Sequence, residues 1–246
     1  MSSKRVYRQD VSGSRLTFFS LKVKETDLWI AVDSSAYHET LPARVEQFVL
    51  NKRNLLEEYL AANPHLATSL EPCLLPEKAP EIFRSMLRSS NLAGVGPMAS
   101  VAGAFAEAVG IYLLNISKEV VIENGGDIFL KVLEPVNVGI YAGTSPLSGK
   151  LALRVDPDRT PLGVCTSSGT VGPSLSLGKA DAAVVLSPST LLADAMATKL
   201  GNLVKTENEL KSALEFAGSV EGVSGALLIY GHKVAVWGEI ELKKYK

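Results

Sequence analysis

The chain has 246 residues, of which 46% are hydrophobic and 21% charged, and 25 Lys and Arg against 26 Asp and Glu give a formal charge of −1. This composition excludes an intrinsically disordered chain. The lack of a positive excess argues against nucleic acid as the main partner, because nothing is available to neutralise many phosphates. At roughly 150 residues per domain, the length suits one or two domains. We predict a single domain over 1–246, with the proline-rich stretch 64–80 as the candidate internal boundary.

The N-terminus is polar and basic, and no apolar segment follows it. A secretory signal of the usual form is therefore not expected. No window of about 18 continuous apolar residues occurs, so no transmembrane helix is expected either. The two cysteines, Cys73 and Cys165, are predicted to be free thiols in a reducing compartment. Together these features predict a cytoplasmic protein with no membrane partner.

The N-terminal part of the chain begins with two segments rich in strand formers, 15–23 and 28–32, which are predicted to form a hairpin. Apolar residues at helical spacing predict an amphipathic helix over 41–60 that ends near Asn63 and Pro64. Four prolines predict that 64–80 is a connection without an element of its own. A shorter helix is expected from Pro80 to about Arg88.

After a glycine-rich loop at 91–97, the small and apolar segment 98–114 is predicted to form a helix that can approach another backbone or a ligand closely. Later helices are predicted at 189–204, with Ser189 as the N-cap, and at 207–216. The remaining apolar segments predict strands at 120–123, 128–132, 137–142, 151–155, 163–166 and 180–186, and a final hairpin of 226–230 and 234–242. Strands outnumber helices without regular βαβ alternation, which predicts an α+β fold with a largely antiparallel sheet and packed helices.

The first candidate functional segment is the turn formed by Asn124, Gly125, Gly126 and Asp127. Two glycines between strands allow a tight hairpin turn, and spacing alone favours that interpretation. In the alternative, the glycines let a ligand contact the backbone while Asn124 and Asp127 offer polar groups at its edge.

The second segment follows a predicted strand and is rich in hydroxyls and glycines: Thr166, Ser167, Ser168, Gly169 and Thr170. Such a run can bind phosphate through backbone N–H groups and hydroxyls, although it lacks the lysine and glycine spacing of a P-loop. By itself the run is better explained as a solvated, flexible loop. The preceding Cys165 has no histidine near it in the sequence, which favours packing of the thiol over a nucleophilic role.

The third segment lies on the predicted helix 189–204, where Asp194 and Thr198 are four residues apart and share a face. A carboxylate and a hydroxyl are hard oxygen ligands that suit Mg²⁺. The alternative, that both side chains satisfy backbone groups in a packed helix, is equally consistent with the spacing.

Taken together and in this order, the segments resemble the ApbE-like family, the FAD:protein FMN transferases. The resemblance covers residues 91–204. It rests on the small-residue helix at 101–108, the Gly-Gly-Asp turn at 123–128, the Thr-Ser-Ser-Gly segment at 166–169 and the Ala-Asp-Ala-Met-Ala-Thr motif at 193–198. It points to a branch of that superfamily rather than to the transferases themselves, and it implies an ApbE-like fold.

The resemblance implies that Asp194, Thr198 and the backbone carbonyl of Ala102 hold Mg²⁺ against the pyrophosphate of FAD. It implies further contacts with the nucleotide from Asn124, Gly125, Gly126, Asp127, Thr166, Ser167, Ser168, Gly169 and Thr170. The implied reaction is displacement of AMP by a hydroxyl nucleophile. No catalytic residue is assigned.

The sequence also departs from the family pattern. Transferases carry a His-x-x-Asp-Pro segment, whereas residues 172–178 contain neither His nor Asp-Pro, and the Lys-Gly pair of the small-residue helix is replaced by Gly103 and Ala104. Three functions therefore stay open: flavinyl or nucleotidyl transfer, pyrophosphate hydrolysis, and a non-catalytic protein that binds a small ligand. The expected partner is a small-molecule nucleotide, and a homodimer is one alternative for the oligomeric state.

Overall fold

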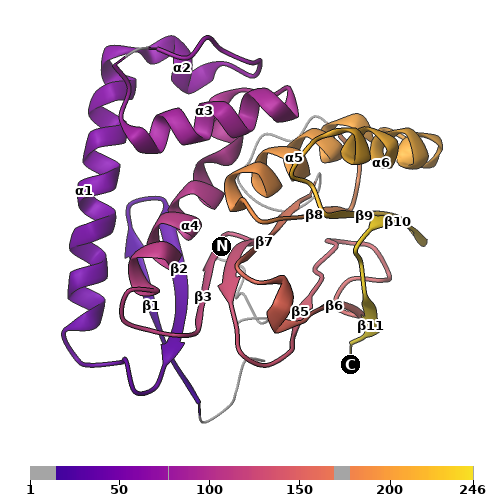
Figure 1. The fold of residues 1–246 in the computed structure, drawn as a ribbon. Helices are drawn as coiled ribbons and strands as arrows, with labels where there is room; N and C mark the ends of the chain where they lie inside the picture. The colour runs from indigo at the N-terminus through magenta and orange to yellow at the C-terminus, as the bar shows by residue number, and fades with distance from the viewer. Residues whose placement is uncertain (1–14, 77, 169–177, 246) are drawn as a thin grey trace.

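The computed structural model describes residues 15–76, 78–168 and 178–245 (Figure 1). Its centre is an eight-stranded sheet in the order β1-β2-β3-β4-β7-β8-β9-β10, and all neighbouring strands run antiparallel. The strands are β1 (Leu16–Val23), β2 (Thr26–Asp33), β3 (Val120–Asn124), β4 (Asp127–Lys131), β7 (Leu162–Ser167), β8 (Ala182–Ser187), β9 (Gly225–Tyr230) and β10 (Lys233–Gly238). This architecture confirms the predicted α+β class with an antiparallel sheet.

A second, three-stranded sheet has the order β11-β6-β5 and consists of β5 (Val136–Gly139), β6 (Leu151–Val155) and β11 (Leu242–Lys244). The prediction of one strand over 234–242 is therefore wrong, because β10 and β11 belong to different sheets. Gly238, with φ of 73°, ends β10, and a Cβ there would lie 2.4 Å from the Ser224 carbonyl oxygen. Glycine is the residue type that tolerates both the positive φ and the close contact, and the chain turns here.

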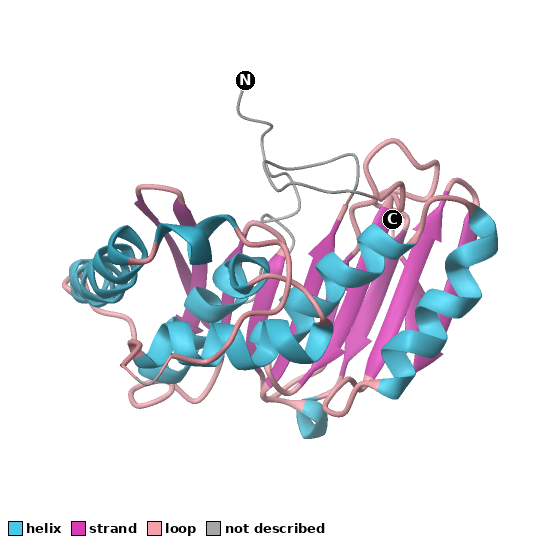
Figure 2. Cartoon of the chain, turned by 90° about the horizontal axis from the view of Figure 1, so that it is seen from above, coloured by secondary structure: helices cyan, strands magenta, loops and turns pink. Residues whose placement is uncertain are grey.

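The helices lie over one face of the large sheet (Figure 2). They are α1 (Leu41–Ala62), α2 (Pro64–Thr68), α3 (Glu81–Ala93), α4 (Val101–Leu113), α5 (Thr190–Leu203) and α6 (Leu210–Ser219), with 3₁₀ turns at Pro97–Ser100, Pro157–Arg159 and Glu207–Glu209. The other face of the large sheet packs against the small sheet, since one buried cluster joins Leu153 and Val155 of β6 to Leu162 and Val184 of the large sheet.

Two helix predictions need correction. Residues 64–80 contain the short helix α2, because Pro64 occupies a first-turn position where its missing N–H costs nothing. Helix α3 continues past Arg88 to Ala93, so the start of the predicted glycine-rich loop is helical. Ser89, Ser90 and Ala93 are buried, which rewards the extra turn, and Gly94 ends the helix with φ of 68°.

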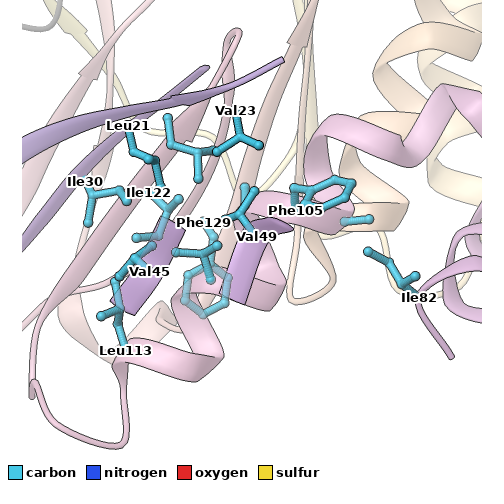
Figure 3. Close-up of a cluster of buried hydrophobic side chains, with 14 of the residues drawn as sticks. Leu21, Val23, Ile30, Val45, Val49, Ile82, Phe105, Leu113, Ile122 and Phe129 are labelled. Carbon is cyan, nitrogen blue, oxygen red and sulfur yellow. The ribbon is translucent and has the colours of Figure 1, made fainter. Parts of the chain in front are cut away.

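The core on the helical face joins α1, α4 and the first strands of the sheet (Figure 3). Val45 and Val49 of α1 contact the same cluster as Ile30 of β2 and Ile122 of β3, and all four are fully buried. This confirms that the apolar face of the amphipathic helix packs on the sheet.

Small residues in α4 allow close approach on two sides. A Cβ on Gly110 would lie 2.1 Å from the ring of Phe129 in β4, and a Cβ on Gly103 would lie 2.5 Å from the Thr190 carbonyl oxygen at the start of α5. Helix α4 is therefore held tightly between the sheet and α5, as its small-residue composition predicted for contact with another backbone.

Within the described ranges, no single helix is long and apolar enough to cross a membrane; α3 and the segment Pro97–Leu113, bent by 103°, meet the length and composition criteria only as a pair. Cys73 is half-buried and Cys165 buried, and both are free thiols as predicted.

Candidate functional site

The turn between β3 and β4 is a tight hairpin in which Asn124 pairs with Asp127. Gly125 and Gly126 have φ of 72° and 112°, in the left-handed region that favours glycine. A Cβ on Gly125 would meet nothing within 4 Å, so backbone conformation rather than space requires glycine there. The Glu123 carboxylate accepts a hydrogen bond of 2.8 Å from the Gly126 N–H and fixes the turn.

Two buried carboxylates converge beside this turn. Asp127 begins β4, opposite Cys165 of β7, and Asp194 comes from the second turn of α5. Each side chain is 8% exposed. Burial, followed by the charge of Asp127, raises the pKa of Asp194 well above its usual value. Burial also raises the pKa of Asp127, to which the charge of Glu123 contributes. Because the charge of Asp127 acts on the buried Asp194, the two aspartates share one low-dielectric site.

The first turn of α4 completes this corner. The Gly103 N–H donates to Asp194 Oδ2 at 2.8 Å, and Asn124 Nδ2 donates to the Ala102 carbonyl oxygen at 3.0 Å. The structure thus brings together four of the predicted site residues: Ala102, Asn124, Asp127 and Asp194. Gly103 is essential to this arrangement because its lack of a side chain lets α4 lie directly against α5.

The other predicted site residues belong to α5 and to the end of β7 and the segment that follows it. Thr198 is half-buried, one turn after Asp194 on α5. The Thr166 carbonyl faces the β3–β4 turn, 3.6 Å from where a Cβ of Gly126 would stand, and Ser167 faces Gly201 near the end of α5. Ser168 lies within the described residues and interacts with another group of the chain. Gly169 and Thr170 lie outside the described residues.

Cys165 packs inside the corner. It is fully buried, and its Sγ donates to the Thr190 carbonyl oxygen at 3.4 Å. Burial, together with the charges of Asp127 and Asp194, raises the pKa of the Cys165 thiol. A thiol held protonated in this way is a poor nucleophile. These contacts favour the packing interpretation of Cys165.

The donor set suits a hard divalent cation. Neither Asp127 nor Asp194 has an ion-pair partner within the described ranges. The carbonyl of Ala102 on α4 and the hydroxyl of Thr198, one turn after Asp194 on α5, are further oxygen atoms of the kind that bind such cations. In those ranges no three His, Cys, Asp or Glu side chains are grouped to hold a metal by themselves. A cation here would therefore take its remaining ligands from backbone oxygen, hydroxyl, water or a bound phosphate, which is typical of Mg²⁺.

Sequence reasoning missed Glu123 and Glu107. Glu107 of α4 accepts a hydrogen bond of 2.6 Å from the Thr190 N–H and so caps the start of α5, the helix that carries Asp194. A signal was present for Glu107, because it is the one charged residue in the apolar segment 98–114. Glu123 gave no such signal, since a glutamate next to a turn is common on protein surfaces.

Comparison with known proteins agrees with the fold. The family model described as "AbpE bacteria" matches residues 8–235. A UPF0280 protein of Methanosarcina acetivorans is 42% identical over 89% of this chain and 85% of its own length. A UPF0280 protein of Methanocaldococcus jannaschii is 40% identical over 89% of each chain.

Two solved structures share the fold. The flavinyl transferase ApbE of Pseudomonas stutzeri has a TM-score of 0.60 and 15% identity, with 93% of this chain and 95% of that chain covered. The ApbE protein of Thermotoga maritima has a TM-score of 0.54 and 10% identity, with 90% and 97% covered. At such low identity these matches show the fold alone. The match over 8–235 and the 40–42% identical relatives show that the chain belongs to the AbpE bacteria family, a group with the ApbE-like fold.

Proposed function

We propose that the chain binds FAD or a related pyrophosphate nucleotide together with Mg²⁺ at the corner between α4, α5 and the β3–β4 turn. Asp194, Thr198 and the Ala102 carbonyl would hold the metal. The turn and the end of β7 would contact the nucleotide. The observation that carries this proposal is the pair of buried carboxylates, Asp127 and Asp194, with no cationic partner among the described residues.

The electrostatics of the corner support a cation. Two carboxylates that share a buried site without a counter-charge make the ionised state unfavourable. A divalent cation reverses this effect because it compensates both charges at once. The hydrogen bond from the Gly103 N–H to Oδ2 fixes the orientation of the Asp194 carboxylate.

The reaction would be attack on the pyrophosphate. When bound, Mg²⁺ neutralises phosphate charge and polarises the phosphorus. A hydroxyl oxygen forms a bond to the FMN phosphorus, the pyrophosphate P–O bond breaks, AMP leaves, and the hydroxyl proton passes to solvent or a base. If the hydroxyl belongs to a protein side chain, FMN is transferred; if it belongs to water, free FMN is released. The solved neighbour named as a flavinyl transferase supports the first option through its fold.

Calorimetric titration of FAD with and without Mg²⁺ tests the binding site. We expect Mg²⁺-dependent binding by the unaltered chain. Loss of binding in Asp194→Asn, with binding retained in the control Asp156→Asn, would support the assignment. Asp156 is a suitable control because it pairs with Arg154 of β6, in the small sheet on the other face of the large sheet. Equal affinity with and without Mg²⁺ in the unaltered chain would contradict the proposal.

A non-catalytic binding protein is the second candidate. The absence of a His-x-x-Asp-Pro segment from residues 172–178 favours it. Incubation with FAD and Mg²⁺, followed by chromatography, distinguishes the candidates: AMP with protein-bound FMN indicates transfer, AMP with free FMN indicates hydrolysis, and intact FAD indicates binding alone. A cytoplasmic location, a homodimer and the absence of a nucleic-acid partner stay predictions from the sequence.

A further inference from the structure

A cavity of about 420 Å³ lies between α1, α3, α4 and the first turn of α5, in the size range of small-molecule sites. It is separate from the acid corner. It lies along the face of α4 that carries Ala104, Glu107, Ala108 and Ile111. The corner is instead formed by Ala102 and Gly103 at the start of that helix. Figure 1 shows α1 and α3 next to α4 on this side of the molecule.

Two opposite charges line the cavity without being paired. Glu107 faces it from α4 and Lys52 from α1, and both side chains are half-buried. Within residues 15–76, 78–168 and 178–245, neither has an opposite charge within ion-pair distance. Glu107 Oε2 accepts from the Thr190 N–H, and Lys52 Nζ lies 5.6 Å from the centre of the Phe48 ring. Neither charge is therefore compensated by an opposite charge of the protein within the described residues, and each group can form an ion pair with a charged ligand.

The walls between these charges are apolar. Phe48 stacks on Tyr112 with 4.5 Å between ring centres, and Ile82 and Leu191 are buried side chains of α3 and α5. Ala108 contributes only a methyl group, which leaves the space open. The cavity therefore combines an aliphatic and aromatic lining with one anionic and one cationic group that have no ion-pair partner among the described residues. A further carboxylate, Glu81, also lines it, but Glu81 is exposed and pairs with Arg84 and Arg88.

We propose that this cavity binds a zwitterionic amino acid with an aliphatic side chain. The ligand's ammonium group is recognised by Glu107, its carboxylate by Lys52, and its side chain by the apolar wall around Ala108 and Ile82. A ligand with a single charge would compensate only one of the two protein groups and leave the other unpaired, which disfavours its binding. This assignment goes beyond the proposed nucleotide site and shares no ligand residue with it.

Isothermal titration with L-leucine as the probe tests the proposal directly. The matched probes are 3-methylbutylamine and 4-methylpentanoate, which keep the side chain and lack one charge each. We expect saturable binding of one leucine per chain and about tenfold weaker binding of each matched probe, as for loss of one charge-assisted hydrogen bond. No saturable binding of leucine, or equal affinity for either singly charged probe, would overturn the proposal.

Variants locate the binding site on the chain. Lys52→Gln and Glu107→Gln should each weaken leucine binding by about tenfold. Ala108→Leu should abolish binding because it fills the cavity, and it avoids the role of Glu107 in capping α5. Lys211→Gln removes an exposed charge on α6 and serves as the control, with unchanged affinity. Wild-type affinity in both Lys52→Gln and Ala108→Leu would show that leucine binds elsewhere and would end the proposal. Because FAD plays no part in these titrations, their outcome is separable from that of the nucleotide site.

Discussion

Two acidic regions of this molecule differ in how their carboxylates are satisfied. In the first, around the start of β3, Asp33 Oδ2 accepts from Ser117 Oγ and from the backbone N–H groups of Lys118 and Glu119. Nearby, the buried Glu119 pairs with Arg15 at 2.9 Å and accepts from a backbone N–H. Each negative charge in this region has donors arranged around it.

The second region is the corner of Asp127 and Asp194. Both carboxylates are buried, burial raises the pKa of each, and the charge of Asp127 raises the pKa of Asp194 further. No cation pairs with either carboxylate among the described residues. An acidic region whose carboxylates all have hydrogen-bond donors or cationic partners stabilises the fold. Buried carboxylates without a counter-charge are typical of binding and catalytic sites. This difference, rather than the number of acids, identifies the corner as a candidate site.

Among the substitutions compared below, removal of one charge from the corner should have the largest effect, and that effect should be on ligand affinity. Asp194→Asn is expected to reduce Mg²⁺-dependent FAD affinity by about 100-fold, as for loss of a buried charged partner, without lowering the free energy of unfolding of the ligand-free protein, because it relieves the repulsion from Asp127. Calorimetry and urea unfolding measure the two quantities. A clear loss of stability in the ligand-free variant would contradict the comparison.

Removal of an acid from the first region should do the reverse. Glu119→Ala leaves the Leu133 N–H and part of the Arg15 guanidinium without an acceptor, and should cost about 2–3 kcal/mol of stability with no change in FAD affinity. Glu119→Gln is the matched variant, since its amide oxygen can still accept, and a smaller loss is expected. The denaturation midpoints of the two variants provide the check, and an Ala variant as stable as the Gln variant would be inconsistent with the assignment.

The close approach of α4 to α5 can be tested at Gly103. Gly103→Ala places a Cβ 2.5 Å from the Thr190 carbonyl oxygen and should cost about 1–3 kcal/mol, the usual range for overpacking. Gly201→Ala is the control in α5, because its Cβ would meet its nearest neighbour, Ser167 Oγ, at 3.4 Å. Thermal unfolding of both variants should separate them clearly; equal midpoints would argue against the tight contact.

A third acidic group, Glu209, should give the smallest effect. It accepts hydrogen bonds from the backbone N–H groups of Thr206 and Lys205 in the capping box that precedes α6, and these bonds lower its pKa. Thr206→Ala should lower the free energy of unfolding by about 1 kcal/mol, as for loss of a helix cap.

Because the folded-state pKa of Glu209 is depressed, its stabilisation is present above its unfolded-state pKa and is lost as the pH falls through the folded-state value. A stability difference between Glu209→Gln and the unaltered chain that persists below that pH would contradict this assignment.

The sequence by itself determined the local elements and the residues of the corner. Alternation and helical spacing depend on neighbouring residues, so the first hairpin, α1 and α5 were predicted with nearly their observed bounds. Ser189 was predicted as the N-cap of α5, and its side chain accepts from the Leu192 N–H. Ala102, Asn124, Asp127 and Asp194 were named from motif order, and they lie together.

Tertiary structure decided what depends on distant contacts. Helix α3 extends beyond its predicted end because burial rewards its last turn, and the final strand divides because the second sheet offers β11 a partner, β6. The roles of Gly103, Glu107 and Glu123 depend on which backbone groups the fold brings to them. Gly103 and Asp194, which share a hydrogen bond, are 91 positions apart in the chain, and Arg15 and Glu119 are 104 positions apart. A local sequence pattern carries no information about such contacts.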